Sequence, residues 1–274
     1  MDVLRYAAFT DHPAGGNPAG IVLDAAGASA EAMLAVAADV GYAETAFVTS
    51  GPTGRRVALR YFSPHAEVPF CGHATVATAV ALAERHGPGV FTFDTPVGPV
   101  ELVTADGSAS FTSVTPQVGE LPGPVLDELL ELTGLHHDDL DELHPPRIAA
   151  AGNPHPVLVV RDAERFDGFT FDPRAARRLL QAHGWPATIT VAHRREPLVF
   201  EARNIFPVGS ITEDPATGSA AAAFGGYLRA LGLVRPPVRL TVHQGRHVGR
   251  PGVLVVDVPE HGGIVVTGTA VPIG

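Results

Sequence analysis

The sequence contains no lysine, so all nineteen of its basic residues are arginines. Without lysine the chain cannot form a Schiff base with a carbonyl substrate or with pyridoxal phosphate, and it cannot carry a Walker-A phosphate loop. The motifs G-x-G-x-x-G, G-x-S-x-G and H-E-x-x-H are absent as well. The usual signatures of dinucleotide-binding proteins, α/β-hydrolases and zinc proteases are therefore missing.

Cysteine occurs once, at Cys71, in a chain of 274 residues. A single cysteine excludes an intramolecular disulfide and a site built from clustered thiolates. The sequence also lacks a long apolar run and a charged segment followed by an apolar one, so we expect no membrane span, no secretory signal and a cytoplasmic location. A net charge of −10 argues against a nucleic-acid surface.

The most distinctive segment that is present runs from Glu67 to Ala83. Cys71-Gly72-His73 follows an extended approach, and from Ala74 to Ala83 no residue is charged. A helix without a polar face is buried on all sides, and this one is too short to cross a bilayer. We expect a central helix whose N-terminus favours an anion or a developing negative charge. The alternative is an ordinary core helix that His73 merely caps.

Upstream, Ser29 is placed to cap a helix that runs to about Val40, with Gly41 as its C-terminal stop. Glu44 then stands where this helix gives way to an apolar strand. A carboxylate at such a junction is either solvated or held in a cleft.

The second half of the sequence repeats features of the first. Gly-Asn-Pro precedes an apolar strand at Asn17 and again at Asn153, an offset of 136 residues, and two helices of small residues follow at similar spacing. We expect two similar halves, each with a helix at its centre. The predicted boundaries are 1–118, completed by a C-terminal strand at about 263–274, and 119–262. The Pro- and Gly-rich passage 117–124 is the expected linker.

Two further groups of residues have competing interpretations. His136-His137-Asp138-Asp139 matches no closed zinc site and is typical of a solvated helix face, so we expect no metal there. Asp214-Pro215 is a good N-cap followed by proline at the first helical position. In the functional interpretation, both central helices point their N-termini at one inter-domain cleft, with Gly72 and Gly218 allowing backbone N–H groups to approach a ligand.

Several segments together resemble the PhzF-like phenazine-biosynthesis proteins, which share their fold with diaminopimelate epimerase. The matching segments are Gly16-Asn17-Pro18-Ala19, Glu44-Thr45-Ala46-Phe47-Val48, Phe70-Cys71-Gly72-His73-Ala74-Thr75, Arg203-Asn204-Ile205-Phe206, Glu213-Asp214-Pro215-Ala216-Thr217-Gly218-Ser219-Ala220, Gln244-Gly245 and Gly249-Arg250-Pro251. The resemblance implies an α+β fold of two pseudo-symmetric halves. Each half would be a curled, mostly antiparallel, barrel-like sheet around a central helix, with the active site between the halves.

The resemblance also implies a role for individual residues. A glutamate matching Glu44 moves a proton between carbons of the substrate, and residues matching His73 and Asp214 assist it, without a metal or an organic cofactor. We expect Asn17, Gly72, Gly218 and Ser219 to bind the substrate, which would be a small, carboxylate-bearing metabolite. A homodimer is the candidate assembly, and neither nucleic acid nor membrane is an expected partner.

The chain departs from the related epimerases, which use one cysteine from each half. Here Cys71 matches the first cysteine and Pro215 the second, so epimerisation by two thiols is excluded. The favoured hypothesis is a cofactor-independent isomerase with Glu44 as proton carrier. The alternatives are a racemase or epimerase that pairs Cys71 with a non-thiol group, and a non-catalytic binding module on the same fold.

Overall fold

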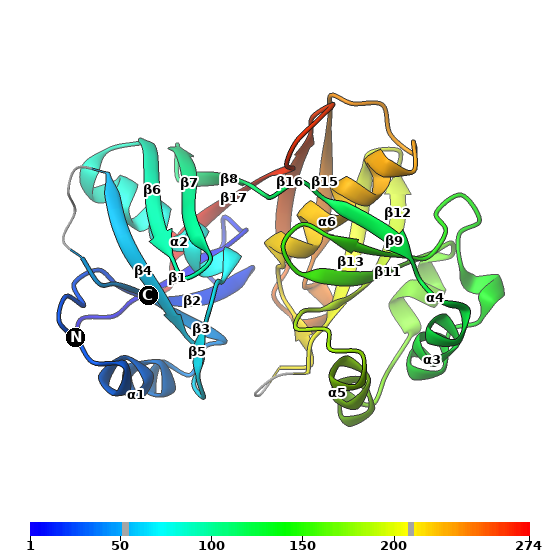
Figure 1. The fold of residues 1–274 in the computed structure, drawn as a ribbon, viewed down its shortest axis with the longest axis horizontal. Helices are drawn as coiled ribbons and strands as arrows, with labels where there is room; N and C mark the ends of the chain where they lie inside the picture. The colour runs from blue at the N-terminus through cyan, green and yellow to red at the C-terminus, as the bar shows by residue number, and fades with distance from the viewer. Residues whose placement is uncertain (51–54, 208–210) are drawn as a thin grey trace. The chain divides into compact units, whose positions relative to one another are not determined.

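A computed structural model describes residues 1–50, 55–207 and 211–274 of the chain (Figure 1). Its contacts divide the chain into two compact units. Unit 1 comprises Met1–Thr112 and Thr267–Gly274, and unit 2 comprises Ser113–Val266. Within the described residues, no helix combines the length and the apolar character that crossing a membrane requires.

Unit 1 is a closed barrel of eight strands. In the order β1-β2-β3-β4-β6-β7-β8-β17, each strand pairs with the next, and β17 pairs with β1 to close the ring. The pairs β2–β3 and β4–β6 are parallel, so the sheet is mixed rather than purely antiparallel. The strands are β1 (Leu4–Ala8), β2 (Asn17–Val22), β3 (Glu44–Val48), β4 (Arg56–Phe62), β6 (Gly89–Thr95), β7 (Gly98–Ala105), β8 (Ser108–Thr112) and β17 (Val265–Pro272), with the short β5 (Glu67–Val68) paired to β4.

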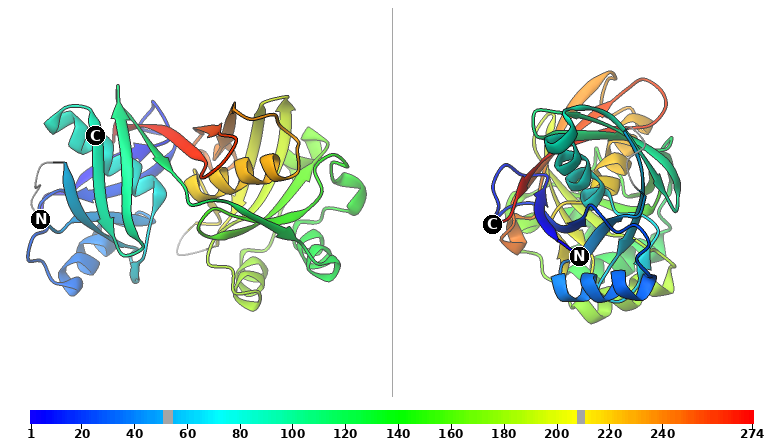
Figure 2. Two further views of the ribbon diagram at one scale, coloured as in Figure 1. Left: turned by 45° about the horizontal axis from the view of Figure 1, so that its top comes forward. Right: turned by 90° about the vertical axis from the view of Figure 1, so that its left-hand side faces the viewer.

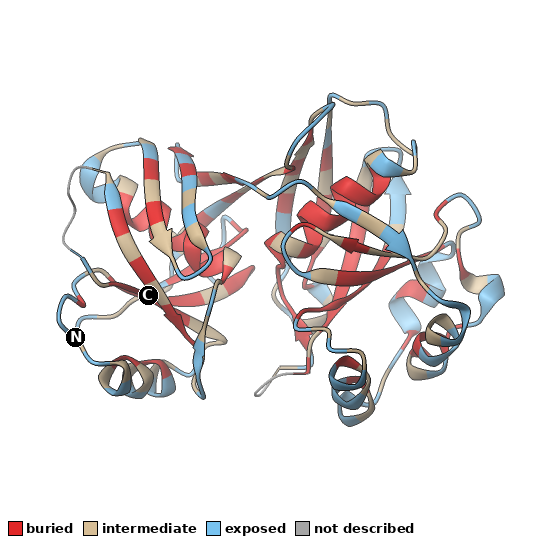
Figure 3. Ribbon diagram, in the orientation of Figure 1, coloured by how far each residue is buried: buried red, intermediate tan, exposed pale blue. Residues whose placement is uncertain are grey.

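Helix α2 (Gly72–His86) lies inside this barrel (Figure 2, right), and every residue from His73 to Leu82 is buried (Figure 3). Its small side chains let strands approach from all sides. The hydroxyls of Thr75 and Thr78 donate to backbone carbonyls one turn earlier, at 2.6 and 2.7 Å, so these buried polar groups are satisfied. The expected central helix is therefore confirmed, and Gly87 is its C-cap.

Helix α1 (Ala30–Val40) packs on the outside of the same barrel. Ser29 caps it by accepting a hydrogen bond from the Ala32 amide at 3.2 Å, and Gly41 ends it in the left-handed conformation. Both expected boundaries are confirmed. Its buried side chains, with Met33 foremost, pack against Phe47 and Phe62.

Unit 2 repeats the arrangement around helix α6 (Gly218–Ala230), which is buried along most of its length. Its strands follow the order β9-β10-β11-β12-β13-β15-β16, with β14 attached to β13. The strands are β9 (Gln117–Glu120), β10 (Arg147–Ala150), β11 (Pro154–Val160), β12 (Ile189–Glu196), β13 (Val199–Ile205), β14 (Glu213–Asp214), β15 (Val238–Gln244) and β16 (Gly252–Val258). Helices α3 (Gly123–Thr133), α4 (Ala163–Gly168) and α5 (Pro173–Ala182) contribute to a separate apolar cluster with strands β11 and β12, and two 3₁₀ turns lie at His137–Asp139 (η1) and Arg246–Val248 (η2).

Strand pairing follows the same pattern in the two units. The series β1-β2-β3-β4-β6-β7 and β10-β11-β12-β13-β15-β16 are parallel at the same two places, and a two-residue strand precedes each central helix. The internal repeat in the sequence thus corresponds to a repeated topology. The linker prediction is wrong, because residues 117–120 form β9, which pairs with β10, and α3 begins at Gly123.

Candidate active site

Three of the chemically active side chains expected from the sequence meet in unit 1. Glu44 is the first residue of β3, Cys71 is the N-cap of α2, and His73 lies in the first turn of that helix. The Cys71 sulfur is 3.5 Å from Glu44 Oε2 and 3.3 Å from His73 Nδ1. Glu44 Oε2 is also 3.5 Å from His73 Nε2. A carboxylate, a thiol and an imidazole therefore share one small volume.

His73 is held in its neutral form. Burial lowers its pKa from the ordinary 6.5 to about 3, and a hydrogen bond to the Pro18 carbonyl only partly opposes this shift. Pro18 follows Asn17, the buried first residue of β2, so this strand fixes the position of the imidazole. A neutral ring of this kind can donate one hydrogen bond and accept another, but it carries no positive charge near pH 7.

Glu44 and Cys71 differ in how far water reaches them. The Glu44 side chain is 17% exposed, whereas Cys71 is buried. The thiol stands at the N-terminus of α2, where the helix dipole stabilises a thiolate. The sequence left the role of Cys71 undecided, and its sulfur lies in contact with both proton-transfer candidates of unit 1.

In unit 2, Asp214 does not have the capping role that its sequence suggested. The N-cap of α6 is Thr217, three residues later, and Asp214 belongs to β14, where it pairs with Asn204. The Thr217 hydroxyl donates to Asp214 Oδ2 at 2.6 Å. Because β14 draws residues 213 and 214 into the sheet, the helix begins later than the Asp-Pro signal indicated.

Gln244, at the end of β15, supports the same group and is not among the site residues expected from the sequence. Its amide nitrogen donates to the Asp214 carbonyl at 2.6 Å and to the Thr217 hydroxyl at 2.9 Å, and its amide oxygen accepts from the Thr217 N–H at 3.2 Å. Gly218 and Ser219 come directly after Thr217 and are the first two residues of α6. The next residue after Gln244, Gly245, has φ +87°, and a Cβ there would overlap the Pro215 carbonyl oxygen.

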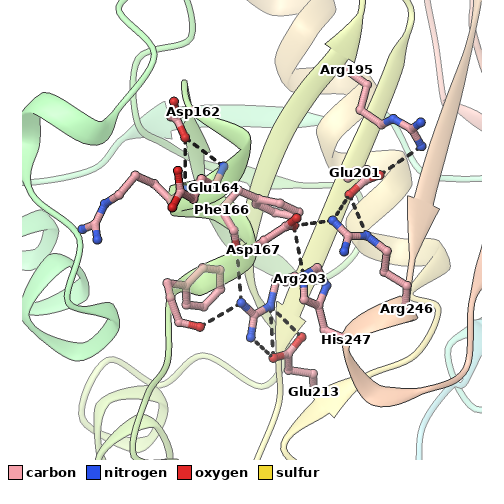
Figure 4. Close-up of polar contacts among 12 residues, drawn as sticks. Asp162, Glu164, Phe166, Asp167, Arg195, Glu201, Arg203, Glu213, Arg246 and His247 are labelled. Atoms are coloured by element: carbon pink, nitrogen blue, oxygen red, sulfur yellow. Dashed lines mark hydrogen bonds and ion pairs between the residues drawn. The ribbon is translucent and has the colours of Figure 1, made fainter.

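Two ion-pair networks brace this part of unit 2 (Figure 4). Arg203 of β13 pairs with Glu213 of β14 at 2.5 Å, and both side chains are less than a tenth exposed. Arg246 of η2 pairs with Glu201 of β13 at 2.6 Å and with Asp167 of α4. The two networks tie β14 and the turn after Gln244 to β13. They therefore fix the strand that contains Asp214 and the turn beside it.

The expected site residues thus fall into two groups. Asn17, Glu44, Gly72 and His73 belong to unit 1, whereas Asp214, Gly218 and Ser219 belong to unit 2. That both groups serve one active site stays a prediction. As for metals, the described residues hold one set of three potential ligands within reach of one ion, namely Glu44, Cys71 and His73.

Comparison with known proteins indicates the family of this chain. A family model described as "Phenazine biosynthesis-like protein" (PhzC-PhzF) matches residues 6–274. The chain is 30% identical to the uncharacterized isomerase YfhB of Bacillus subtilis, over 98% of this chain and 96% of the relative. It is 36% identical to an uncharacterized isomerase of Deinococcus radiodurans, over 95% of this chain and 88% of the relative.

Solved structures extend the likeness. A PhzF-family phenazine biosynthesis protein of Bacillus anthracis superposes with a TM-score of 0.86 at 29% identity, covering 100% of this chain and 98% of that one. A hydroxyproline epimerase of Agrobacterium vitis shares the fold alone, with a TM-score of 0.64 at 15% identity, covering 99% and 90% of the two chains. The chain therefore belongs to the phenazine-biosynthesis-like PhzC-PhzF family.

Proposed function

We propose that this protein is an isomerase that moves a proton between carbons of a small, carboxylate-bearing metabolite, with Glu44 as general base and acid and without a metal or coenzyme. The observation that carries the proposal is the contact of Glu44 Oε2 with both Cys71 and a neutral His73, each at 3.5 Å. Relatives of this chain are named isomerases, which supports the same reaction class.

Glu44 is suited to the transfer because its carboxylate is partly exposed beside two buried groups. It would take a proton from a carbon made acidic by a neighbouring carbonyl or carboxylate group, and would return that proton to another carbon. The neutral His73 donates its single N–H to the Pro18 carbonyl, so its other ring nitrogen can accept a hydrogen bond from Glu44 in its protonated form. The N-terminal amides of α2, beginning at Gly72, favour the negative charge that develops on the substrate oxygen.

Substrate binding in this proposal uses backbone groups rather than lysine. Gly218 and Ser219 open α6, and the amides at such a helix end are suited to a carboxylate. Asp214, which accepts a hydrogen bond from Thr217, is the second candidate for proton transfer. Asn17 would contribute from the start of β2. Assembly as a homodimer is a separate part of the proposal, which sedimentation analysis tests. A cytoplasmic location is a further part, which cell fractionation tests.

The test is proton exchange with solvent. Pools of small carboxylic acids are incubated with the protein in deuterated water, and labelled products are identified by mass spectrometry. Wild type should introduce deuterium, and Glu44→Gln should reduce the rate by at least the roughly 10²–10⁴-fold that a positioned acid–base group contributes. Glu67→Gln is the matched control, since Glu67 is a surface carboxylate paired with Arg60. Equal exchange in wild type and Glu44→Gln would remove Glu44 from the mechanism.

A second candidate is a racemase or epimerase in which Cys71 exchanges the proton with a non-thiol partner. It is favoured by the position of the sulfur, 3.3 Å from His73 and 3.5 Å from Glu44. Cys71→Ser separates the two reactions. An isomerase based on Glu44 should retain most of its exchange activity in this variant, whereas an enzyme that uses a thiolate base should lose several orders of magnitude.

A further inference from the structure

We propose that Glu44, Cys71 and His73 form a binding site for Zn²⁺, and that the bound ion reversibly inhibits the enzyme. The binding itself depends only on the three side chains. The inhibition rests on the proposed function, in which the Glu44 carboxylate carries the proton and a bound ion would block it.

The distances among the three ligand atoms match those of zinc ligands. Cys71 Sγ is 3.5 Å from Glu44 Oε2 and 3.7 Å from His73 Nε2, and Nε2 is 3.5 Å from Oε2. Zinc lies about 2.3 Å from sulfur and about 2.0–2.2 Å from imidazole nitrogen or carboxylate oxygen, so tetrahedral coordination separates such ligands by roughly 3.3–3.7 Å. The three donor atoms therefore have the separations of zinc ligands. Because the sulfur is 3.3 Å from Nδ1 and 3.7 Å from Nε2, it lies beside the imidazole rather than along the Nε2 lone pair, so zinc binding requires a rotation of the Cys71 side chain.

The chemistry of the three ligands also suits this ion. Sulfur, imidazole nitrogen and carboxylate oxygen are the donors that zinc uses in proteins. On binding, the Cys71 thiol would lose its proton to solvent, and the thiolate with the Glu44 carboxylate would balance the two positive charges of the ion. His73 is already neutral, and its hydrogen bond to the Pro18 carbonyl fixes its ring as second-shell partners do in metal sites.

The supporting backbone is rigid where these ligands are attached. Cys71 and His73 are held by the first turn of the buried helix α2, and Glu44 by β3, which pairs with β2 and β4. Three protein ligands leave a fourth position for water, as in open zinc sites. The positive end of the α2 dipole opposes a cation, so we expect reversible binding rather than a permanent structural ion.

The exposed histidines and aspartates near residue 137 provide a contrast. His137 pairs with Asp127 at 2.9 Å, but both side chains are about two-thirds exposed. Water already solvates these groups, so they would gain little by binding an ion. Substitution of His137 therefore serves as the matched control for binding at the Glu44–Cys71–His73 site.

Binding is tested on the reduced, full-length protein by titrating Zn²⁺ in competition with a chromogenic chelator. Wild type should take up one ion per chain with release of about one proton from the thiol. Cys71→Ser and Glu44→Gln should each weaken binding more than about 100-fold, because even second-shell substitutions cost 10–100-fold, and His137→Gln should change nothing. With Co²⁺ as the probe, a thiolate-to-metal charge-transfer band should appear in wild type and be absent in Cys71→Ser.

The inference is overturned if folded wild type binds no ion, if Cys71→Ser and Glu44→Gln bind as tightly as wild type, or if His137→Gln alone loses binding. The inhibitory part is tested separately, since Zn²⁺ should abolish deuterium exchange and a chelator should restore it. Exchange activity without zinc binding would refute the zinc site and leave the isomerase proposal standing. Zinc binding in a protein that exchanges no label would support the zinc site and refute the isomerase proposal.

Discussion

The buried pair of Arg203 and Glu213 gives the sharpest test of how unit 2 is held together. The guanidinium contacts both Glu213 oxygens at 2.5–3.2 Å, donates to the carbonyls of Phe166 and Phe169, and lies 3.6 Å from the centre of the Phe169 ring. The two side chains are 8% and 7% exposed. Arg203→Met would keep much of the side-chain volume but would leave the Glu213 carboxylate buried without a cation.

Breaking a buried pair from one side costs about 3–5 kcal/mol, because an uncompensated charge remains. With a urea m-value of about 2 kcal/mol/M, the unfolding midpoint should fall by on the order of 2 M. The double variant Arg203→Met/Glu213→Leu removes both charges and should cost less than Arg203→Met alone.

The assay can be confined to unit 2 because Trp185, the one tryptophan of the chain, lies there, packed against its apolar cluster and stacked on His183. Its fluorescence in urea reports the unfolding of this unit. Since Glu213 and Asp214 are the two residues of β14, folded Arg203→Met should also have reduced exchange activity. A loss below about 1 kcal/mol, or a double variant less stable than Arg203→Met, would refute the assignment of this pair as the brace of β14.

Three further predictions follow from named contacts. Gly245→Ala should melt at a markedly lower temperature, because φ is +87° and the added Cβ would overlap two backbone carbonyl oxygens; an unchanged melting temperature would contradict this. Lowering the pH from about 6.5 toward 4 should reduce the free energy of unfolding, because burial lowers the pKa of His73 to about 3 and that of His155 to about 4. In that range the unfolded histidines bind protons that the folded ones do not, so a urea titration series in which stability rises on acidification would disprove it. Thr217→Val removes the 2.6 Å hydrogen bond to Asp214 and should cost about 1–3 kcal/mol with lower exchange activity; wild-type values for both would show that the bond has no role.

Local signals in the sequence were sufficient where the structure depends on local contacts. Ser29 and Gly41 mark the ends of α1 because capping involves groups within three or four residues of one another. The uncharged run after His73 identifies the buried helix α2 because burial on all sides excludes charge from every face. The repeat of Gly-Asn-Pro likewise indicated a repeated topology.

Local sequence signals gave a wrong or incomplete prediction where pairing between distant segments decides the structure. Asp214-Pro215 has the local features of a helix start, but pairing of Asp214 with Asn204 in the sheet delays the helix to Gly218. Gln244 reaches Asp214 across 30 residues of sequence, a distance that no spacing rule covers. The proximity of Glu44 and His73 was implied by the family resemblance, whereas the inclusion of Cys71 in their contact required the structure.

The internal repeat also shows that the two units use equivalent positions differently. In unit 1, Ala19 of β2 lies opposite Glu44. In unit 2, His155 occupies the place of Ala19 two residues after the shared asparagine, and its ring contacts the backbone and hydroxyl of Thr188. In the register of β11 and β12, Val157 lies opposite Thr190, so two residues earlier His155 lies opposite Thr188, which is the counterpart of Glu44.

That counterpart is neutral and fully enclosed. Thr188 donates to the Asn204 side chain at 2.7 Å, and Asn204 pairs through its backbone with Asp214. A carboxylate at Thr188 would be buried beside a His155 that burial keeps neutral, at a large desolvation cost. The repeated topology therefore carries different side chains at equivalent positions of the two units. Unit 1 carries a carboxylate, Glu44, at the start of β3, whereas unit 2 has a threonine at the equivalent position before β12 and carries Asp214 on β14, which pairs with β13.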